Sequence, residues 1–184
     1  MSKFIIVIDE QNDFISTAFG SWEAIYAHEN AVKYLTDINR DTIVIFTKDT
    51  HKKENNTTIE SKKIPTHCIK ENYGWKISKS LNELFNNSPY VIEKETFGSF
   101  KLPIHMVDVF DFKDDIDEIE IFGFNTDVAV ISNALILRSA FPRAKISVLA
   151  NLCAGTTPVN HVNALEVMKS CLIDVVYLVE YISN

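Results

Sequence analysis

The chain has 184 residues, a formal net charge of −7 and 46% hydrophobic residues, with five Gly and five Pro. This composition argues against a disordered, fibrous or low-complexity protein, and one domain spanning residues 1–184 is long enough to bury a sizeable core. The acidic balance, without a dense Lys/Arg patch, argues against nucleic acid or an anionic membrane as a partner.

The hydrophobic pattern predicts neither a targeting signal nor a membrane span. The apolar run Phe4–Ile8 ends at Asp9, which makes it too short for the core of a secretory signal. The three cysteines, Cys68, Cys153 and Cys171, are odd in number and form no CxxC spacing. This pattern predicts reduced thiols in a cytoplasmic protein rather than a disulfide framework.

Short apolar runs rich in β-branched residues alternate along the chain with segments of helical periodicity. Several runs are apolar on consecutive residues, which is typical of strands covered on both faces. Thr157 and Pro158 are a good N-cap and first helical residue for the last helix. The expected elements, in chain order, are a strand at Phe4–Ile8, a helix at Trp22–Ile38, a strand at Ile43–Thr47, a helix at Leu81–Phe85, a strand at Tyr90–Glu93, a helix at Ile104–Phe110, a strand at Glu118–Phe122, a helix at Thr126–Phe141, a strand at Ile146–Leu149, a helix at Val159–Cys171 and a strand at Val175–Leu178.

This alternation predicts an α/β fold, a three-layer α-β-α sandwich with helices on both faces of a mostly parallel six-stranded sheet. Such a fold is Rossmann-like, and its crossovers are expected to be right-handed. Ligands of these sheets bind beyond the carboxyl ends of the strands. The polar residues at those ends are therefore the candidates for a functional site.

Polar residues follow the first two expected strands at their carboxyl ends. Asp9 comes directly after the first strand, and Asp49 and His51 follow the second, spaced so that both side chains point the same way on an extended chain. With Glu60 and His67 they form an Asp/His/Glu/His set that suits Zn²⁺, Mn²⁺ or Fe²⁺. Taken singly, each residue also has an ordinary explanation as a helix cap, a turn residue or a solvated side chain.

Two further strand ends carry features that suit charge stabilisation. Lys94 ends the third strand, where it is either an ordinary exposed lysine or, beside Asp9, a cation for the site. The segment GFNTDVAV, residues 123–130, runs from the fourth strand into a helix whose amino-terminal N–H groups favour negative charge. A glycine turn with Thr126 or Asp127 as N-cap explains the same segment.

Together these segments resemble the nicotinamidase/isochorismatase-like cysteine hydrolases over nearly the whole chain. Order and spacing both agree with that family, so the combined match is far more specific than any single motif. The matching stretches are VIDEQNDF, TKDTH, PTHC followed by YGW, VIEKETFGSF, GFNTDVAV and the tail from SNALILRSAF to ALEVMKSC. The resemblance implies an isochorismatase-like fold and, in the nicotinamidase branch, hydrolysis of nicotinamide to nicotinate and ammonia in NAD salvage. It also implies a small amide as ligand and assembly into a homo-oligomer.

The resemblance assigns a role to each site residue. Asp9 matches the catalytic acid/base, and Lys94 matches the catalytic lysine. The backbone N–H groups of Asn125 and Ala129 would form the oxyanion hole, beside a cis peptide bond between Phe124 and Asn125. The substrate pocket would be walled by Phe14 and Phe97, and a divalent metal, foremost Zn²⁺, would be held by Asp49, His51, Glu60 and His67. Glu60 is the ligand that varies across the family.

Ala129 stands where the family carries its nucleophilic cysteine. A methyl group cannot attack a carbonyl, so we expect no useful turnover of nicotinamide. Three explanations stay open: a nucleophile removed by design, a natural pseudoenzyme that binds a related ligand, and an isochorismatase-type reaction in which aspartate protonates a vinyl ether. The third fits least, because that branch does not keep the D-x-H metal set. Asn125, where close relatives often have a small residue or cysteine, favours natural divergence.

Overall fold

The six expected strands form one parallel sheet in the computed structural model, which describes residues 2–39, 42–53, 58–86, 89–108 and 116–181. The strand order is β3-β2-β1-β4-β5-β6, the order of doubly wound dinucleotide-binding folds. All five neighbouring pairs run parallel. The strands are β1 (Ser2–Ile8), β2 (Ile43–Asp49), β3 (Val91–Lys94), β4 (Ile116–Phe124), β5 (Lys145–Ala154) and β6 (Asp174–Val176).

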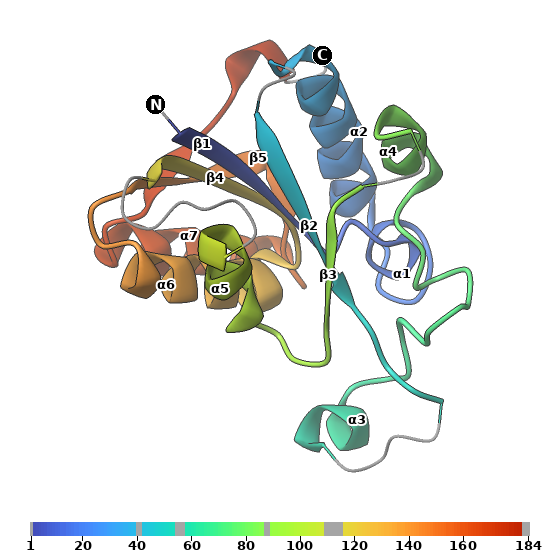
Figure 1. Ribbon diagram of the computed structural model, residues 1–184. Coiled ribbons are helices and arrows are strands. Elements are labelled where there is room, and N and C mark those ends of the chain that lie inside the picture. Colours follow the sequence, from blue (N-terminus) through green and yellow to red (C-terminus); the bar gives the residue numbers. More distant parts are fainter. Residues whose placement is uncertain (1, 40–41, 54–57, 87–88, 109–115, 182–184) are drawn as a thin grey trace.

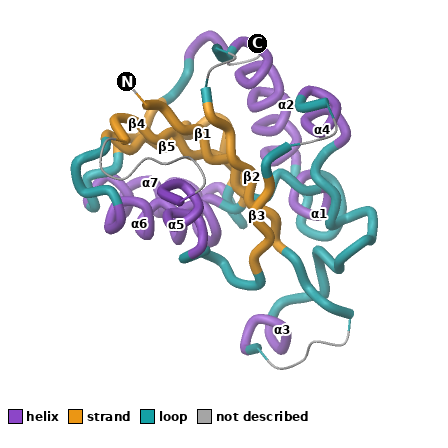
Figure 2. The backbone as a smooth tube through the Cα atoms, in the orientation of Figure 1, coloured by secondary structure: helices purple, strands orange, loops and turns teal. Residues whose placement is uncertain are grey.

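Helices cover both faces of the sheet, which confirms the α/β sandwich. The helices are α1 (Asn12–Ile15), α2 (Trp22–Asp37), α3 (Ile59–Lys63), α4 (Lys79–Leu84), α5 (Lys101–Asp108), α6 (Ile131–Ala140) and α7 (Pro158–Ser170), with a π-helix η1 (Thr126–Val130) and a 3-10 helix η2 (Val179–Tyr181). In Figure 1, α1, α2 and α4 lie on one side of the strands, and α5, α6 and α7 lie on the other. Figure 2 shows the strands as one layer between these groups, with α3 standing apart beyond β2 and β3.

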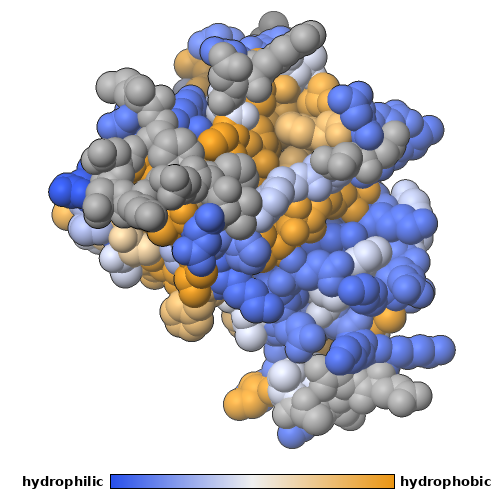
Figure 3. All heavy atoms as spheres, viewed as in Figure 1, coloured by the Kyte–Doolittle hydropathy of each residue, from blue (hydrophilic) through white to orange (hydrophobic). Residues whose placement is uncertain are grey.

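The central strand β1 is buried on both faces, as its consecutive apolar residues predict. Every residue of the run Phe4–Ile8 in β1 is fully buried, and the core continues through β4 and β5. Figure 3 shows hydrophobic side chains in the upper middle of this face and hydrophilic ones over much of its right side. No helix among the described residues is long and apolar enough to cross a membrane. Cys68, Cys153 and Cys171 are all unpaired thiols.

Helix starts follow local capping chemistry. The Ser21 hydroxyl accepts a hydrogen bond from Ala24 N–H at the start of α2. At the start of α7, the Thr157 side chain accepts from Asn160 N–H, with Pro158 in the first turn. The predicted start of the last helix is therefore confirmed.

Several element boundaries differ from the prediction. The expected helix at 126–141 is the π-helix η1 followed by α6. The expected helix at 104–110 begins earlier, at Lys101, and Phe110 lies outside the described residues. The last strand ends at Val176 rather than Leu178, because both backbone polar groups of Leu178 bond to the Asn151 side chain instead of to a strand.

Candidate functional site

The predicted polar residues meet at the carboxyl edge of the sheet. Asp9 directly follows β1, Asp49 is the last residue of β2, and Lys94 is the last residue of β3. Asp49 and Lys94 are register partners across the β2–β3 pair. The three charged groups are therefore neighbours because the three adjacent strands end together.

Asp9 and Lys94 form a buried ion pair. The Lys94 Nζ lies 2.6 Å from Asp9 Oδ2 and 3.7 Å from Asp49 Oδ1. The Thr47 hydroxyl donates to Asp9 Oδ1 at 2.7 Å. Burial raises the pKa of Asp9 to about 6, an effect that Lys94 opposes and Asp49 reinforces. Burial alone would lower the pKa of Lys94, but the carboxylates of Asp9 and Asp49 outweigh burial and raise it.

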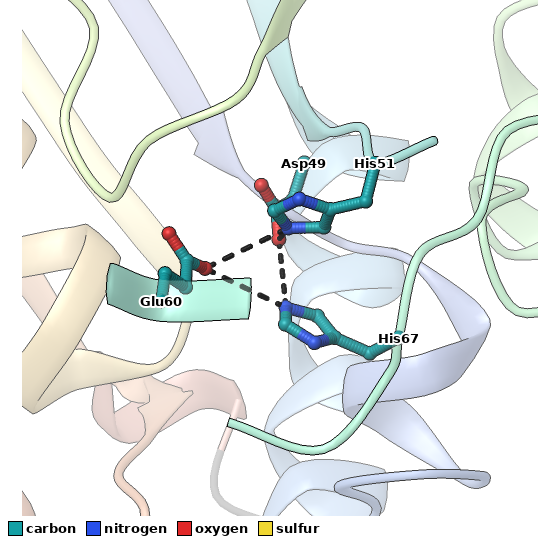
Figure 4. A group of neighbouring side chains, drawn as sticks. All are labelled: Asp49, His51, Glu60 and His67. Atoms are coloured by element: carbon teal, nitrogen blue, oxygen red, sulfur yellow. Dashed lines mark hydrogen bonds and ion pairs between the residues drawn. The ribbon is translucent and has the colours of Figure 1, made fainter. Parts of the chain in front are cut away.

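Four side chains gather beside this pair with the donor chemistry of a metal site (Figure 4). One ligand atom from each of Asp49, His51, Glu60 and His67 lies within 4.8 Å of the others. Both imidazole Nε2 atoms lie 3.0 Å from the same Asp49 oxygen, Oδ2. Glu60, on the short helix α3, completes the group with its Oε1 3.6 Å from His51 and 3.8 Å from His67.

The tautomer of His67 fits a bound cation. Its Nδ1 lies 2.8 Å from the Pro65 carbonyl, to which it donates, so the lone pair of the neutral ring is on Nε2. That lone pair faces carboxylate oxygens, a contact that needs either a proton or a cation between the atoms. Asp49 Oδ1 is buried and has no hydrogen-bond partner among the described residues. The donor set of two imidazoles and two carboxylates therefore fits a divalent ion such as zinc.

The carboxylates of this group titrate differently because their partners differ. Burial would raise the pKa of Asp49, but hydrogen bonds from His51 and His67 and the charge of Lys94 hold it far below its usual value. The pKa of Glu60 is raised by partial burial and by the negative charge of Asp49. Asp49 is therefore the ionised anchor of the group at neutral pH.

A cavity of about 90 Å³ joins the ion pair to the candidate metal ligands. Every predicted site residue except His51 lines it: Asp9, Phe14, Asp49, Glu60, His67, Lys94, Phe97, Asn125 and Ala129. His51 borders a neighbouring hollow that shares Glu60 and His67. The sequence thus identified residues that the fold brings to one place.

Aromatic rings form the apolar walls of the cavity. Phe14 and Phe97, the two predicted ring residues, both line it, and Phe19 lies beside them as a third ring that the sequence did not indicate. The Phe19 ring stacks on Phe14 with centroids 6.0 Å apart and meets the His67 ring edge-on at 5.0 Å. These contacts hold a candidate metal ligand against a wall that suits a flat aromatic molecule.

Ala129 lies in η1, and η1 begins directly after the cis peptide bond between Phe124 and Asn125. Its carbonyl accepts a hydrogen bond from the Asn133 side chain at 2.8 Å. The same Asn133 amide group bonds the Phe97 carbonyl, and its oxygen accepts from Ser99 N–H. Asn133 therefore ties the segment after β3 to the segment around Ala129, so that two walls of the cavity keep a fixed spacing.

Sequence reasoning missed Asn133 and a second bridging amide, Gln11. Gln11 exchanges two hydrogen bonds with the Asp49 backbone, at 2.8 Å through Nε2 and 2.7 Å through Oε1. Its Nε2 also donates to the Trp75 carbonyl at 2.8 Å. These bonds span 38 and 64 residues, so no local pattern could have revealed them.

None of the three thiols is placed to act as a nucleophile in the cavity. Cys68 and Cys153 are buried, and neither they nor Cys171 line the cavity. Burial raises the pKa of the Cys153 thiol to about 12 and raises the pKa of Cys68 further above its ordinary value. Thiols with such raised pKa values are inert at neutral pH.

Comparison with known proteins gives the family. The family model described as the isochorismatase domain matches residues 3–178. The chain belongs to the isochorismatase family. A comparison with curated protein sequences finds no match.

Solved structures of nicotinamidases share this fold. The nicotinamidase/pyrazinamidase of Bacillus subtilis superposes with a TM-score of 0.82 at 23% identity, covering 95% of this chain and 99% of that one. The pyrazinamidase of Pyrococcus horikoshii in complex with zinc gives 0.78 at 20% identity over 97% and 100%. The yeast nicotinamidase bound to the inhibitor nicotinaldehyde gives 0.80 at 18% identity over 96% and 100%. This isochorismatase-family chain thus has the isochorismatase-like hydrolase fold.

Proposed function

We propose that this chain carries a nicotinamidase-type site that binds a small aromatic carboxamide, such as nicotinamide, beside a divalent metal, and that Ala129 leaves the site without a nucleophile. The observation that supports the proposal most is the shared cavity. Asp9, Lys94, three of the four candidate metal ligands and Ala129 all border it. The nicotinamidase fold of the solved relatives points the same way.

The cavity offers complementary contacts to each part of such a ligand. Phe14, Phe19 and Phe97 offer apolar area to a ring. Asp9, whose pKa of about 6 lets it exchange a proton near neutrality, can accept from or donate to the carboxamide. Backbone N–H groups at Asn125 and Ala129 are the proposed donors to the amide oxygen.

The candidate metal ligands complete the binding site. Asp49, His51, Glu60 and His67 would hold a divalent ion, with zinc the first choice and Mn²⁺ or Fe²⁺ as alternatives. A bound ion would supply positive charge that orients the ligand's ring nitrogen. The Pro65 carbonyl fixes the orientation of the His67 ring by accepting a hydrogen bond from its Nδ1.

Replacement of the thiol by a methyl group decides what this site does to an amide. In a thiol enzyme of this kind Asp9 would take the thiol proton and return it to the departing ammonia, with Lys94 favouring the thiolate. Ala129 has no proton to give and no lone pair to attack with. Binding and polarisation alone leave roughly 10³–10⁴-fold acceleration over water in a hydrolase precedent. We therefore expect binding without useful turnover.

The test restores the thiol and measures binding separately. Ala129→Cys is assayed for nicotinamide-dependent ammonia release in zinc-loaded protein, with Ala129→Ser as the size-matched control and Asp9→Asn added to Ala129→Cys as the mechanistic control. Strong release that needs Asp9 supports an enzyme whose nucleophile is missing. Calorimetric binding of nicotinamide without release from Ala129→Cys supports a natural ligand-binding pseudoenzyme. If the protein does not bind nicotinamide and Ala129→Cys releases no ammonia, the proposal is refuted.

A second candidate function is acid-catalysed cleavage of a vinyl ether by Asp9. The supporting observation is the raised pKa of Asp9, which keeps part of the carboxyl protonated near neutral pH without any need for a thiol. Incubation of the unmodified chain with isochorismate tests this reaction. Pyruvate release that Asp9→Asn abolishes would favour it over the amide-binding function.

A further inference from the structure

A second polar cluster lies on the α2/α4 side of the sheet, outside the cavity described above. Glu10 follows Asp9 in the chain, yet its side chain contacts His28 of α2. His28 in turn contacts Ser80 in the first turn of α4. None of Glu10, His28 and Ser80 lines the cavity that holds Asp9. This cluster is therefore separate from the site around Asp9.

The cluster has the connectivity of a nucleophile, a base and an orienting acid. Ser80 Oγ lies 3.0 Å from His28 Nε2, and His28 Nδ1 lies 2.7 Å from Glu10 Oε2. Both distances are within hydrogen-bond range for a proton relay. Glu10 is completely buried, whereas Ser80 is exposed to solvent. The buried end is thus the carboxylate and the accessible end is the hydroxyl, as nucleophilic chemistry requires.

The shared proton of Glu10 and His28 sets the imidazole tautomer. Burial raises the pKa of Glu10; burial alone would lower the pKa of His28, but Glu10, with a smaller contribution from Glu29, raises it instead. Glu10 Oε1 has no hydrogen-bond partner among the described residues, and Glu10 Oε2 contacts His28 Nδ1. With one proton between Oε2 and Nδ1, Nε2 keeps its lone pair and accepts from the Ser80 hydroxyl.

The three residues are held by the backbone around them. Ser78 N–H donates to the Glu10 carbonyl at 3.0 Å, which fixes the start of α4 against the end of β1. The Ser78 hydroxyl caps α4 by accepting from Leu81 N–H, and it lies 3.3 Å from Ser80 Oγ. Ser80 is therefore presented to His28 from an anchored turn rather than from a loose loop.

We propose that Ser80 is a base-activated nucleophile that accepts an acyl group from small activated acyl donors, such as aryl esters or acyl phosphates. The Ser80 O–H proton passes to His28 Nε2 while Oγ forms a bond to the carbonyl carbon. The bond from that carbon to the leaving group then breaks, and the leaving group takes the proton from Nε2. The products are an ester on Ser80 and the free phenol or phosphate. Because Ser80 lies on an open surface, the donor has to bring its own good leaving group.

The test uses p-nitrophenyl acetate and the full-length protein. Peptide mass mapping over time gives the acetylation rate at Ser80 and, in the same sample, at Ser170. Ser170 is the matched control because it is also exposed and helical, but its hydroxyl donates to the Glu166 carbonyl. General-base activation of roughly 10²-fold or more predicts that Ser80 is labelled about that much faster than Ser170.

Variants separate base catalysis from mere exposure. His28→Gln should slow Ser80 labelling about 10²-fold and leave Ser170 unchanged. The wild-type rate should rise with pH as His28 loses its second proton, and Glu10→Gln should move that rise to lower pH, because Glu10 raises the pKa of His28. Glu29 is the other charge that acts on His28, so Glu29→Gln should move the rise less.

Three results would overturn the proposal. Equal labelling of Ser80 and Ser170 would mean that Ser80 is not activated. An unchanged rate in His28→Gln, or a labelling rate in the wild type that ignores pH, would mean that His28 is only a structural partner. If circular dichroism shows that Glu10→Gln does not fold, His28→Gln and the wild-type pH profile still decide. The outcome is independent of nicotinamide binding, because the two sites share no residue.

Discussion

Removal of one imidazole from the candidate metal group gives the sharpest test of that site. His67→Asn takes away an Nε2 atom that lies 3.0 Å from Asp49 and 3.8 Å from Glu60. Loss of a partner that only orients a ligand costs 10–100-fold in metal affinity, so loss of a direct ligand should cost about 100-fold or more. At a zinc concentration of 100 times the wild-type Kd, metal binding stabilises the fold by about 2.7 kcal/mol. In the variant the same zinc contributes about 0.4 kcal/mol.

Thermal unfolding converts these values into measurable shifts. For a chain of this length, 1 kcal/mol corresponds to about 2–4 °C, so zinc should raise the wild-type Tm by about 5–11 °C and the His67→Asn Tm by about 1–2 °C. The protein is first stripped with a chelator and then titrated with zinc, manganese and iron separately. His105→Asn is the matched control, because His105 is half-buried and contacts Tyr90 rather than the metal group.

The pH dependence of the same experiment has a defined sign. The pKa of His67 is raised, because its hydrogen bonds to Asp49 and Pro65 outweigh burial. In metal-free protein the protonated ring therefore stabilises the fold below the unfolded pKa, and that stabilisation is lost as pH rises through the folded pKa. Zinc needs the neutral ring, so metal-linked stabilisation grows with pH. Equal zinc shifts in wild type and His67→Asn, or no shift with any of the three metals, would refute the metal assignment.

Three further predictions concern the frame of the site. Gly123→Ala should destabilise by more than about 3 kcal/mol in urea unfolding, because Gly123 has φ +127° and a Cβ would lie 1.9 Å from the Ile8 carbonyl oxygen. Phe97→Ala should weaken nicotinamide binding by about two- to tenfold by calorimetry, since an aromatic contact contributes about 0.5–1.5 kcal/mol. The pKa of Asp9, raised from 3.8 to about 6, makes stability fall as pH rises between those values. Asp9→Asn should remove about 3 kcal/mol of that fall, measured by urea unfolding at both ends of the window.

The sheet could be predicted because its signal is local. Every strand contains a short run rich in β-branched or aromatic residues, and several of these runs are apolar on consecutive residues, as is typical of strands covered on both faces. The lengths of the strands could not be predicted from such local runs. β5 continues to Ala154 because, after a register shift between Ile121 and Gly123, it pairs again with the end of β4. The helices α1 and α3 have four and five residues, too few for helical periodicity to show in the sequence.

The site could be predicted in part because a parallel sheet gathers its strand ends. Asp9, Asp49 and Lys94 follow from that rule alone once their strands are recognised. Glu60 and His67 were candidates because their side chains suit a metal and lie near Asp49 and His51 in the sequence. Only the family resemblance assigned them as ligands, because periodicity does not place the segment that carries them. The side chains that connect distant segments, Gln11 and Asn133, carry no sequence signal. The contact between Glu10 and Ser80 through His28 spans 18 and 52 residues and likewise appears only in three dimensions.

The charged residues beside Ala129 can be retained for two different reasons, the stability of the fold and the binding of a metal, and the buried charges illustrate the first. Asp9, Asp49 and Lys94 are all buried, so each carries a charge that the others compensate. Removal of one partner from a buried pair costs about 3–5 kcal/mol, because the other charge is left unpaired. The fold therefore retains these residues whether or not the site performs chemistry, and Lys94→Met should lower the free energy of unfolding by that amount even without metal or ligand.

Glu60 provides the contrasting case. It is half-buried on α3, a short helix with no buried residue, and within the described part of the chain its carboxylate forms ion pairs with the two imidazoles alone. Glu60→Gln should change the stability of metal-free protein by less than about 0.5 kcal/mol while weakening zinc binding at least tenfold. A Glu60 variant that loses stability as Lys94→Met does, with unchanged zinc affinity, would mean that the metal group also serves the fold. If the Glu60 variant keeps its stability and loses zinc affinity, these ligands serve metal binding. The methyl group of Ala129 does not remove the need for metal binding.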